Sequence, residues 1–276
     1  MNVLVLLVVA LTGLFVLWVM QTALLIIVGQ RPWLAWPLRH RCKHPIIRWG
    51  MKAVVQLVLL GVLFGFPAAI GEHPIEYHLA RLQPASWPLL FGVAGTTVLA
   101  MMPMLLFNLA VGWVRLNPRY TFSKTVRKVL QSMLTPLPLA FVEEALFRGV
   151  ILDQLLKAMP GAAGNVAALI TSAAIFAAAH FFRPQKRLLL PAVGLFGLGM
   201  MLGVAYIIGG HSYWLPVGVH AGGVLFIQFH RPFVEYRGPA VLIGYSSYPN
   251  GGLFGLTTMA DYVAALAYWF KGLPVI

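Results

Sequence analysis

Two adjacent carboxylates and an arginine stand in a stretch of sequence that is otherwise almost wholly apolar. Glu143 and Glu144 are followed by Arg148 within residues 134–152. Ionisable side chains at membrane depth are costly and usually mark a function. Residues four apart share one face of a helix, so Glu144 and Arg148 are predicted to form an ion pair, whereas Glu143 lies about 100° away around the helix. Glu143 is then the carboxylate without a counter-charge, which makes it the candidate general base.

Two histidines in other apolar segments complete the set of chemically active residues. They are His180 and His220, and alanine or glycine flanks each of them. Small residues let helix backbones approach closely, so a polar side chain beside them can meet partners on neighbouring helices instead of lipid. We therefore expect one polar site on three helices, made of Glu143, Glu144, Arg148, His180 and His220.

The composition excludes an ordinary soluble fold. Hydrophobic residues make up 60% of the 276 residues, charged residues make up only 10%, and the mean hydropathy is +0.83. One water-facing fold cannot hide so much apolar surface. The sequence therefore predicts an all-α, polytopic bundle of transmembrane helices in a lipid bilayer. Cys42 is the only cysteine, so neither an internal disulfide nor a thiolate metal cluster is expected.

About eight segments are apolar and long enough to cross a bilayer. The first has no basic N-terminal region and no cleavage site, so we expect it to be retained as a helix. The fourth begins near Leu134, which puts Glu143 roughly 13 Å along its axis, with His180 and His220 at comparable depth. The eight segments are residues 3–28, 51–70, 87–114, 134–156, 166–182, 188–208, 213–229 and 253–270.

Lysine and arginine predict the orientation of the chain. Most of the 20 lie in the loops that follow the first, third, fifth and seventh segments. By the positive-inside rule these loops face the cytoplasm, so both termini are expected outside it, in a cell (inner) membrane, with the site open to the cytoplasmic half. The net charge of +13 is spread over several short loops rather than gathered on one face, so no nucleic-acid partner is expected.

Two connecting segments have unusual compositions. Residues 31–48 interleave basic residues with tryptophan, which is typical of a segment lying on the cytoplasmic leaflet and equally of a basic loop. Residues 238–252 are too rich in glycine and proline for a continuous helix and too apolar for an ordinary loop. This second segment is predicted to dip into the membrane or to cap a cavity.

The polar constellation resembles the CPBP family of CAAX proteases and bacteriocin-processing enzymes, also called the Abi family of intramembrane glutamic endopeptidases. The resemblance spans roughly residues 134–229 and implies that Glu143 activates a water, which attacks the scissile carbonyl, while the histidines stabilise the oxyanion. Three motifs carry it in order: Glu143-Glu144-x-x-x-Arg148, Phe176-x-x-x-His180, and His220.

The resemblance also implies a division of the chain and a class of substrate. Residues 1–133 are expected to form an N-terminal three-helix membrane region with basic cytoplasmic loops, residues 134–232 a CPBP-like catalytic core, and residues 233–276 a C-terminal loop and the last transmembrane helix. The substrate would be a membrane-anchored or amphipathic protein or peptide. A prenylated CAAX protein, a bacteriocin leader and other anchored tails fit this description equally.

One position departs from the family pattern. The third motif has asparagine or a similar polar residue four positions after its histidine, where this chain has Val224. Valine cannot donate a hydrogen bond, so either the histidines suffice, another residue substitutes, or catalysis has been lost. The candidate substitutes are Asn165, Asn250 and Asp261, whose ordinary roles would be a helix N-cap, a turn residue and a lone polar group in the last helix.

Glu143, His180 and His220 also form a donor set that zinc accepts, with a fourth position left open. No HExxH-type pair is present on one helix, and the resembled family is treated as glutamate-dependent. Catalysis without a metal or other cofactor is therefore expected, with zinc as the alternative.

Two other classes of function compete with an endopeptidase. A catalytically inactive CPBP-like membrane scaffold or immunity protein would use the glutamates as an ion-paired packing element, and Val224 favours this reading. An ion-coupled transporter would use buried glutamate and histidine as a proton relay. No inverted repeat or pair of broken helices supports the transporter.

Overall fold

Helices dominate the part of the chain that the computed structural model describes, namely residues 2–27, 45–82, 86–117, 120–180, 189–245, 248–249 and 251–270. Nearly all of the basic segment 31–48 lies outside these residues, as do Cys42 and Asn250. The helices are α1 (Asn2–Ile27), α2 (Pro45–Ala69), α3 (Pro74–Leu79), α4 (Trp87–Ala110), α5 (Phe122–Leu134), α6 (Pro136–Glu144), α7 (Asp153–Ala158), α8 (Ala162–His180), α9 (Leu189–Ile208), α10 (Trp214–His230), α11 (Ala240–Ile243) and α12 (Leu253–Phe270).

Shorter elements connect these helices. A π-helix, η3 (Ala145–Leu152), joins α6 to α7, and 3₁₀ turns follow α3 and α10 as η2 (Ala80–Leu82) and η4 (Arg231–Phe233). Strands β1 (Val114–Leu116) and β2 (Val234–Tyr236) pair antiparallel, with Val114 opposite Tyr236, and tie the segments after α4 and α10 together. Strands β3 (Gly244–Tyr245) and β4 (Tyr248–Pro249) form a second antiparallel pair within the glycine-rich segment 238–252.

Four of the described helices are long and apolar enough to cross a membrane: α1, α4, α8 and α9. A fifth candidate is the bent helix pair Ala53–Ala69 and Pro74–Leu82, whose parts meet at 104° and form a broken span or a re-entrant loop. These findings confirm an all-helical membrane bundle but not eight spans. The predicted span 134–156 is divided among α6, η3 and α7, the 17 residues of α10 are short for a crossing, and Asp261 lowers the hydropathy of α12.

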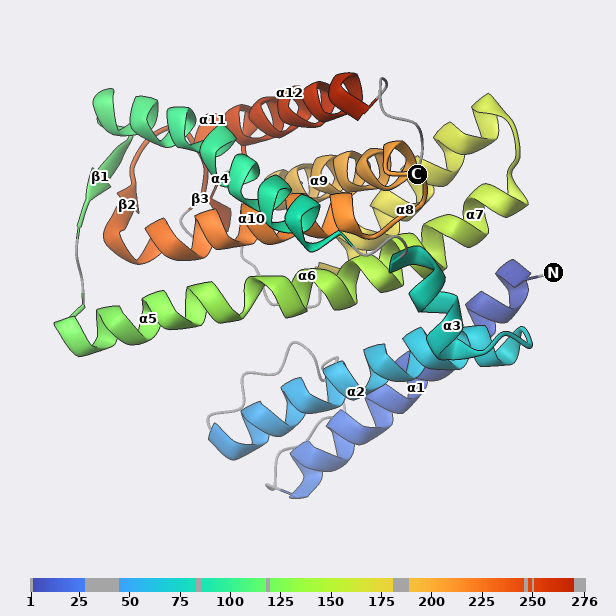
Figure 1. Cartoon of the computed structure of the whole chain (residues 1–276). Coiled ribbons are helices and arrows are strands. Elements are labelled where there is room, and N and C mark those ends of the chain that lie inside the picture. Colours follow the sequence, from blue (N-terminus) through green and yellow to red (C-terminus); the bar gives the residue numbers. More distant parts are fainter. Residues whose placement is uncertain are drawn as a thin grey trace.

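Helix α10 lies at the centre of the bundle and packs against α4, α6 and α9. Two glycines of α10 allow the close approach to α4. A Cβ on Gly218 would press against Val93, and a Cβ on Gly222 would press against Ala94 and Thr97. Around this centre α8 pairs with α9, α12 packs on α4 and α9, and α1 pairs with α2 (Figure 1). The bundle therefore brings α6, α8 and α10, which carry the glutamates and histidines, into one neighbourhood.

The segment that carries the glutamates runs through α5, α6, η3 and α7 almost along one line (Figure 1). Helix α5, which the sequence analysis did not predict, is amphipathic, with Lys124, Arg127 and Lys128 on one face and exposed apolar residues on another. Its end at Leu134 and the start of α6 at Pro136 fit the preference of proline for the first turn of a helix. The fourth predicted helix therefore begins two residues later than Leu134.

Candidate active site

The two glutamates end α6, and the π-helix η3 begins at the next residue. A π-helix closes hydrogen bonds between residues five apart, is rare, and occurs frequently at functional sites. All but one of its eight residues are buried, the exception being Ile151. The rare π-helical geometry therefore begins directly after the two glutamates and includes Arg148.

Glu144 is fully buried, and its partners are the guanidinium of Arg148 and the imidazole ring of His220. Nη1 of Arg148 donates to Oε1 of Glu144 at 3.1 Å, and Nδ1 of His220 lies 2.7 Å from the same oxygen. The side chains of Glu144 and Arg148 are 0% and 1% exposed. The ion pair predicted from the four-residue spacing is therefore present. Its burial means that it holds the site together rather than meeting a substrate.

Glu143 points to a different neighbourhood and is the more accessible carboxylate. Its Oε2 lies 3.6 Å from Nε2 of His180 and 3.7 Å from Nε2 of His220, and its side chain is 17% exposed. These separations are longer than a direct hydrogen bond and suit groups bridged by one shared water. All five predicted site residues thus meet, and Glu143 is the carboxylate that both histidines face.

Each histidine ring is fixed through its other nitrogen. Nδ1 of His180 is 2.8 Å from the carbonyl oxygen of Phe176, and Nδ1 of His220 is bound to Glu144. A carbonyl oxygen only accepts hydrogen bonds, so the Nδ1 of His180 carries a proton. The rings therefore have different partners behind them, a neutral carbonyl for His180 and a carboxylate for His220.

Phe176 is the aromatic centre of the site, a role that the sequence analysis did not assign. Its ring is buried, with the Arg148 guanidinium 4.7 Å from the ring centroid. The ring centroids of His180 and His220 lie 4.5 and 6.2 Å from it. The first residue of the Phe-x-x-x-His motif thus packs against the arginine and both histidines, and it can hold their spacing.

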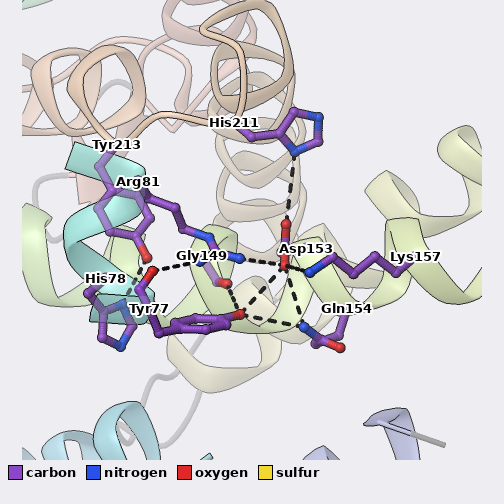
Figure 2. Close-up of polar contacts among 9 residues, drawn as sticks. All are labelled: Tyr77, His78, Arg81, Gly149, Asp153, Gln154, Lys157, His211 and Tyr213. Atoms are coloured by element: carbon purple, nitrogen blue, oxygen red, sulfur yellow. Dashed lines mark hydrogen bonds and ion pairs between the residues drawn. The ribbon is translucent and has the colours of Figure 1, made fainter. Parts of the chain in front are cut away.

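Contacts from several elements hold the π-helix. Nη2 of Arg148 donates to the Gly199 carbonyl at 3.0 Å, and the Ser172 hydroxyl donates to the Phe147 carbonyl at 3.3 Å. The Tyr77 hydroxyl donates to the Gly149 carbonyl at 2.7 Å (Figure 2). A Cβ on Gly149 would overlap the hydroxyl and ring of Tyr213, the residue that precedes α10, so only glycine allows this packing. Helices α3, α8 and α9 and the start of α10 therefore all fix η3.

A second polar cluster continues from η3 into α7 (Figure 2). At its centre, Oδ2 of Asp153 lies 2.7 Å from Nη2 of Arg81 and 2.9 Å from Nζ of Lys157. His211 approaches the other carboxylate oxygen at 4.0 Å. The sequence analysis did not pair Asp153, although an aspartate ending an apolar run was the available signal. The cluster attaches η2 and the α9–α10 connection to α7, which continues the segment that carries the glutamates.

The candidate substitutes for the missing polar partner lie elsewhere. Val224 is half-buried on α10, one turn beyond His220. Asn165 is exposed at the opposite end of α8 from His180 and lies inside the helix, which begins at Ala162, so the predicted N-cap is wrong. Asp261 is exposed on α12. Neither Asn165 nor Asp261 therefore reaches the histidines, and Asn250 is outside the described residues.

The donor set for a metal can be compared with this geometry. Within the described ranges, no three His, Cys, Asp or Glu side chains are arranged as a group that could hold a metal ion. Glu143, His180 and His220 nevertheless converge, with Oε2 of Glu143 lying 3.6 and 3.7 Å from the two Nε2 atoms.

A comparison with known proteins covers the region that contains the three motifs. Residues 125–226, less than half of the chain, match the family model described as Type II CAAX prenyl endopeptidase Rce1-like, and the matched range includes all five site residues. No curated protein and no solved structure matches the chain. The match implies a membrane protease, that is, a peptide hydrolase. The resemblance inferred from the motifs is thereby confirmed: residues 125–226 are similar to the Rce1-like endopeptidases of the CPBP family.

Proposed function

We propose that this protein is an intramembrane endopeptidase in which Glu143 activates a water to hydrolyse a peptide bond of a membrane-associated protein or peptide. The observation that carries the proposal is the position of Glu143, whose Oε2 lies 3.6 and 3.7 Å from the two histidine Nε2 atoms. Glu144, by contrast, is enclosed by Arg148 and His220. A carboxylate base beside polar groups in a water-poor site is what uncatalysed peptide hydrolysis lacks.

The reaction follows from these positions. Glu143 accepts a proton from the water while the water oxygen bonds to the scissile carbonyl carbon, and the carbonyl electron pair moves onto its oxygen. When the tetrahedral intermediate collapses, the carbonyl double bond re-forms, the C–N bond breaks, and the proton held by Glu143 passes to the leaving amine. The step needs no oxidant and no second substrate besides water.

The two histidines take different roles because different groups lie behind them. The carboxylate of Glu144 stabilises positive charge on the ring of His220, so His220 is suited to donate from Nε2 to the developing oxyanion. Nδ1 of His180 donates to the carbonyl oxygen of Phe176, so Nε2 is the ring nitrogen left to contact and orient the attacking water. In the zinc alternative, the same two Nε2 atoms and Glu143 would be the ligands.

The finer topology belongs to the same proposal. A bundle of about eight spans, with both termini outside the cytoplasm of a cell (inner) membrane, places Glu143 in the cytoplasmic half of the bilayer. The substrate then arrives from the cytoplasmic side, at the core formed by residues 134–232. The regions 1–133 and 233–276 flank this core, and the former supports it through the Tyr77 contact with Gly149.

The test compares two glutamate-to-glutamine variants in liposomes. Purified wild type, Glu143→Gln and the control Glu76→Gln, an exposed residue of α3, are incubated with prenylated C-terminal peptides, acylated leader peptides and single-span peptides. We expect wild type and Glu76→Gln to cleave and Glu143→Gln to be slower by at least about a hundredfold, with unchanged folding. The same assays with a zinc chelator separate the two mechanisms: lost cleavage that added zinc restores would assign a metalloprotease.

A catalytically inactive scaffold is the second candidate, and Val224 is the observation that favours it. In that case the buried pair of Glu144 and Arg148 only packs the bundle. Folded wild-type protein would then cleave none of the peptides, and Glu143→Gln would leave the biological function intact.

A further inference from the structure

A groove runs along the outer side of the bundle between α4 and α12, which lie beside each other (Figure 1). Its volume is about 520 Å³. Helix α4 contributes mainly apolar side chains, and α12 contributes a carboxylate and three hydroxyl groups. The lining residues are Ala100, Pro103, Met104, Phe107, Phe254, Thr257, Thr258, Asp261 and Tyr262. None of them belongs to the Glu143 site.

Asp261 is exposed in this groove, and no ion pair to it occurs among the described residues. Its depth follows from Ala100, which lines the same groove and lies near the middle of the membrane-span candidate α4 (Trp87–Ala110). At 1.5 Å per residue, either end of α4 is about 15–20 Å away. A carboxylate at such a depth is expensive unless a partner neutralises it, and such residues generally mark functional sites.

The polar part of the groove offers several hydrogen-bond acceptors. The Thr257 hydroxyl donates its proton to the Phe254 carbonyl, which leaves the oxygen lone pairs free to accept. Pro103 has no N–H, so the Leu99 carbonyl, one turn earlier on α4, lacks its helical hydrogen bond beside the groove. Together with the Asp261 carboxylate, these groups suit an ammonium group, which carries three donors and no acceptor.

Depth decides which cation can reach the groove. Amine headgroups of lipids remain at the membrane interface, well above the middle of α4. A second copy of this chain also fails to supply the charge, because the basic side chain within the described apolar core is Arg148, which is 1% exposed and paired with Glu144. A lysine on a transmembrane helix of another protein reaches this depth, and its flanking apolar side chains can pack against Met104, Phe107 and Phe254.

We infer that the α4–α12 groove docks a transmembrane helix of a partner protein, and that a lysine near the middle of that helix pairs with Asp261. No residue that lines the groove belongs to the Glu143 site or to α10, which carries His220. Binding is therefore separate from the proposed cleavage, and the partner can remain attached while a substrate is processed.

The test uses synthetic transmembrane peptides as probes for the full-length protein in phosphatidylcholine vesicles. Four leucine-rich peptides of about 21 residues are compared: one with lysine at the centre, one with leucine there, one with aspartate there, and one with the lysine near one end. Association is measured by energy transfer between labelled protein and labelled peptide. The protein variants are Asp261→Asn, the charge reversal Asp261→Lys, and Glu76→Gln as an acid-to-amide control outside the groove.

We expect wild type and Glu76→Gln to bind the central-lysine peptide about tenfold more tightly than the leucine peptide. Asp261→Asn should abolish this preference, and Asp261→Lys should instead prefer a peptide with a central aspartate. Equal binding of the lysine and leucine peptides to wild type would overturn the inference, as would a preference that survives in Asp261→Asn. Tighter binding of the end-lysine peptide would assign the groove to an interfacial amine and contradict the depth argument.

Discussion

The hydroxyl of Tyr77 donates a 2.7 Å hydrogen bond to the carbonyl oxygen of Gly149, and this contact joins the N-terminal region to the π-helix next to the glutamates. Tyr77 lies on α3, in the second part of the bent helix pair. The guanidinium carbon of Arg81 lies 3.9 Å from the centroid of its ring. Arg81 in turn binds Asp153, one residue after the π-helix ends. Helix α3, through Tyr77, and the following turn η2, through Arg81, therefore contact η3 and α7, so the N-terminal region supports the site directly.

Removing the Tyr77 hydroxyl should impair the site from a distance. Tyr77→Phe leaves the ring in place but leaves the buried Gly149 carbonyl without this donor, at a cost of about 1–3 kcal/mol in the free energy of unfolding. We expect a lower melting temperature and a lower kcat with little change in KM, because the π-helix positions Glu143 but does not bind substrate. Tyr268→Phe, on an exposed tyrosine of α12, is the control. If both variants behave alike, the Tyr77 contact does not position the site.

Gly149 should tolerate no side chain. In Gly149→Ala the added methyl would overlap Tyr213, and we expect a loss of about 1–3 kcal/mol in stability together with reduced cleavage. The matched control is Gly223→Ala, since a Cβ on Gly223 meets no atom within 4 Å. That variant should keep its stability or gain up to about 1 kcal/mol, because alanine favours helix. Thermal unfolding in detergent measures both, and an unimpaired Gly149→Ala would contradict the packing described for η3 and α10.

The contacts among the candidate site residues were easier to predict from sequence than the structure that supports them. The spacing of Glu144 and Arg148 predicts their ion pair because side chains four apart meet in an α-helix and still meet at this junction. The π-helix is not predictable in this way, because an apolar run has no pattern that distinguishes five-residue from four-residue hydrogen bonding. The Tyr77 contact joins residues 72 positions apart, so no local sequence pattern predicts it.

The number of membrane spans is confirmed only in part, with four or five candidates against about eight predicted, for a related reason. Hydropathy identifies apolar segments, yet it cannot show that segment 134–156 divides into α6, η3 and α7 or that the second span turns by 104°. Helix α5 was overlooked because its basic residues were interpreted only as a topology signal. Their spacing on one face, opposite Phe122, Val126 and Leu130, was the amphipathic pattern that predicts it.

Arg148 should be needed for folding as well as for activity. Arg148→Leu leaves the carboxylate of Glu144 buried without its cation, and breaking a buried pair in this way costs about 3–5 kcal/mol. Arg148→Lys keeps the charge but loses the planar fork that also binds the Gly199 carbonyl, so its stability should be intermediate. Glu143→Gln, in contrast, should unfold at nearly the wild-type temperature. Equal losses of folded protein in Arg148→Leu and Glu143→Gln would contradict the separate roles of the two glutamates.

The position of Val224 offers a gain-of-function test of the oxyanion site. Val224 is half-buried one turn after His220 on the same face of α10, so Val224→Asn places an amide donor beside the histidine. Single oxyanion donors are worth about 10²–10³ in kcat, so we expect Val224→Asn to raise kcat by about tenfold or more with little effect on KM. Val224→Leu, which adds bulk but no donor, should show no such rise.

The double variant Glu143→Gln/Val224→Asn separates the donor from the base. An added amide stabilises negative charge on the carbonyl oxygen but cannot take a proton from water, so the double variant should remain as inactive as Glu143→Gln alone. Cleavage assays of the four proteins under one set of conditions form a complete cycle. If the double variant regained activity, the water would be activated by another group, and the histidine that faces Glu143 without a carboxylate behind it, His180, would be the first to examine.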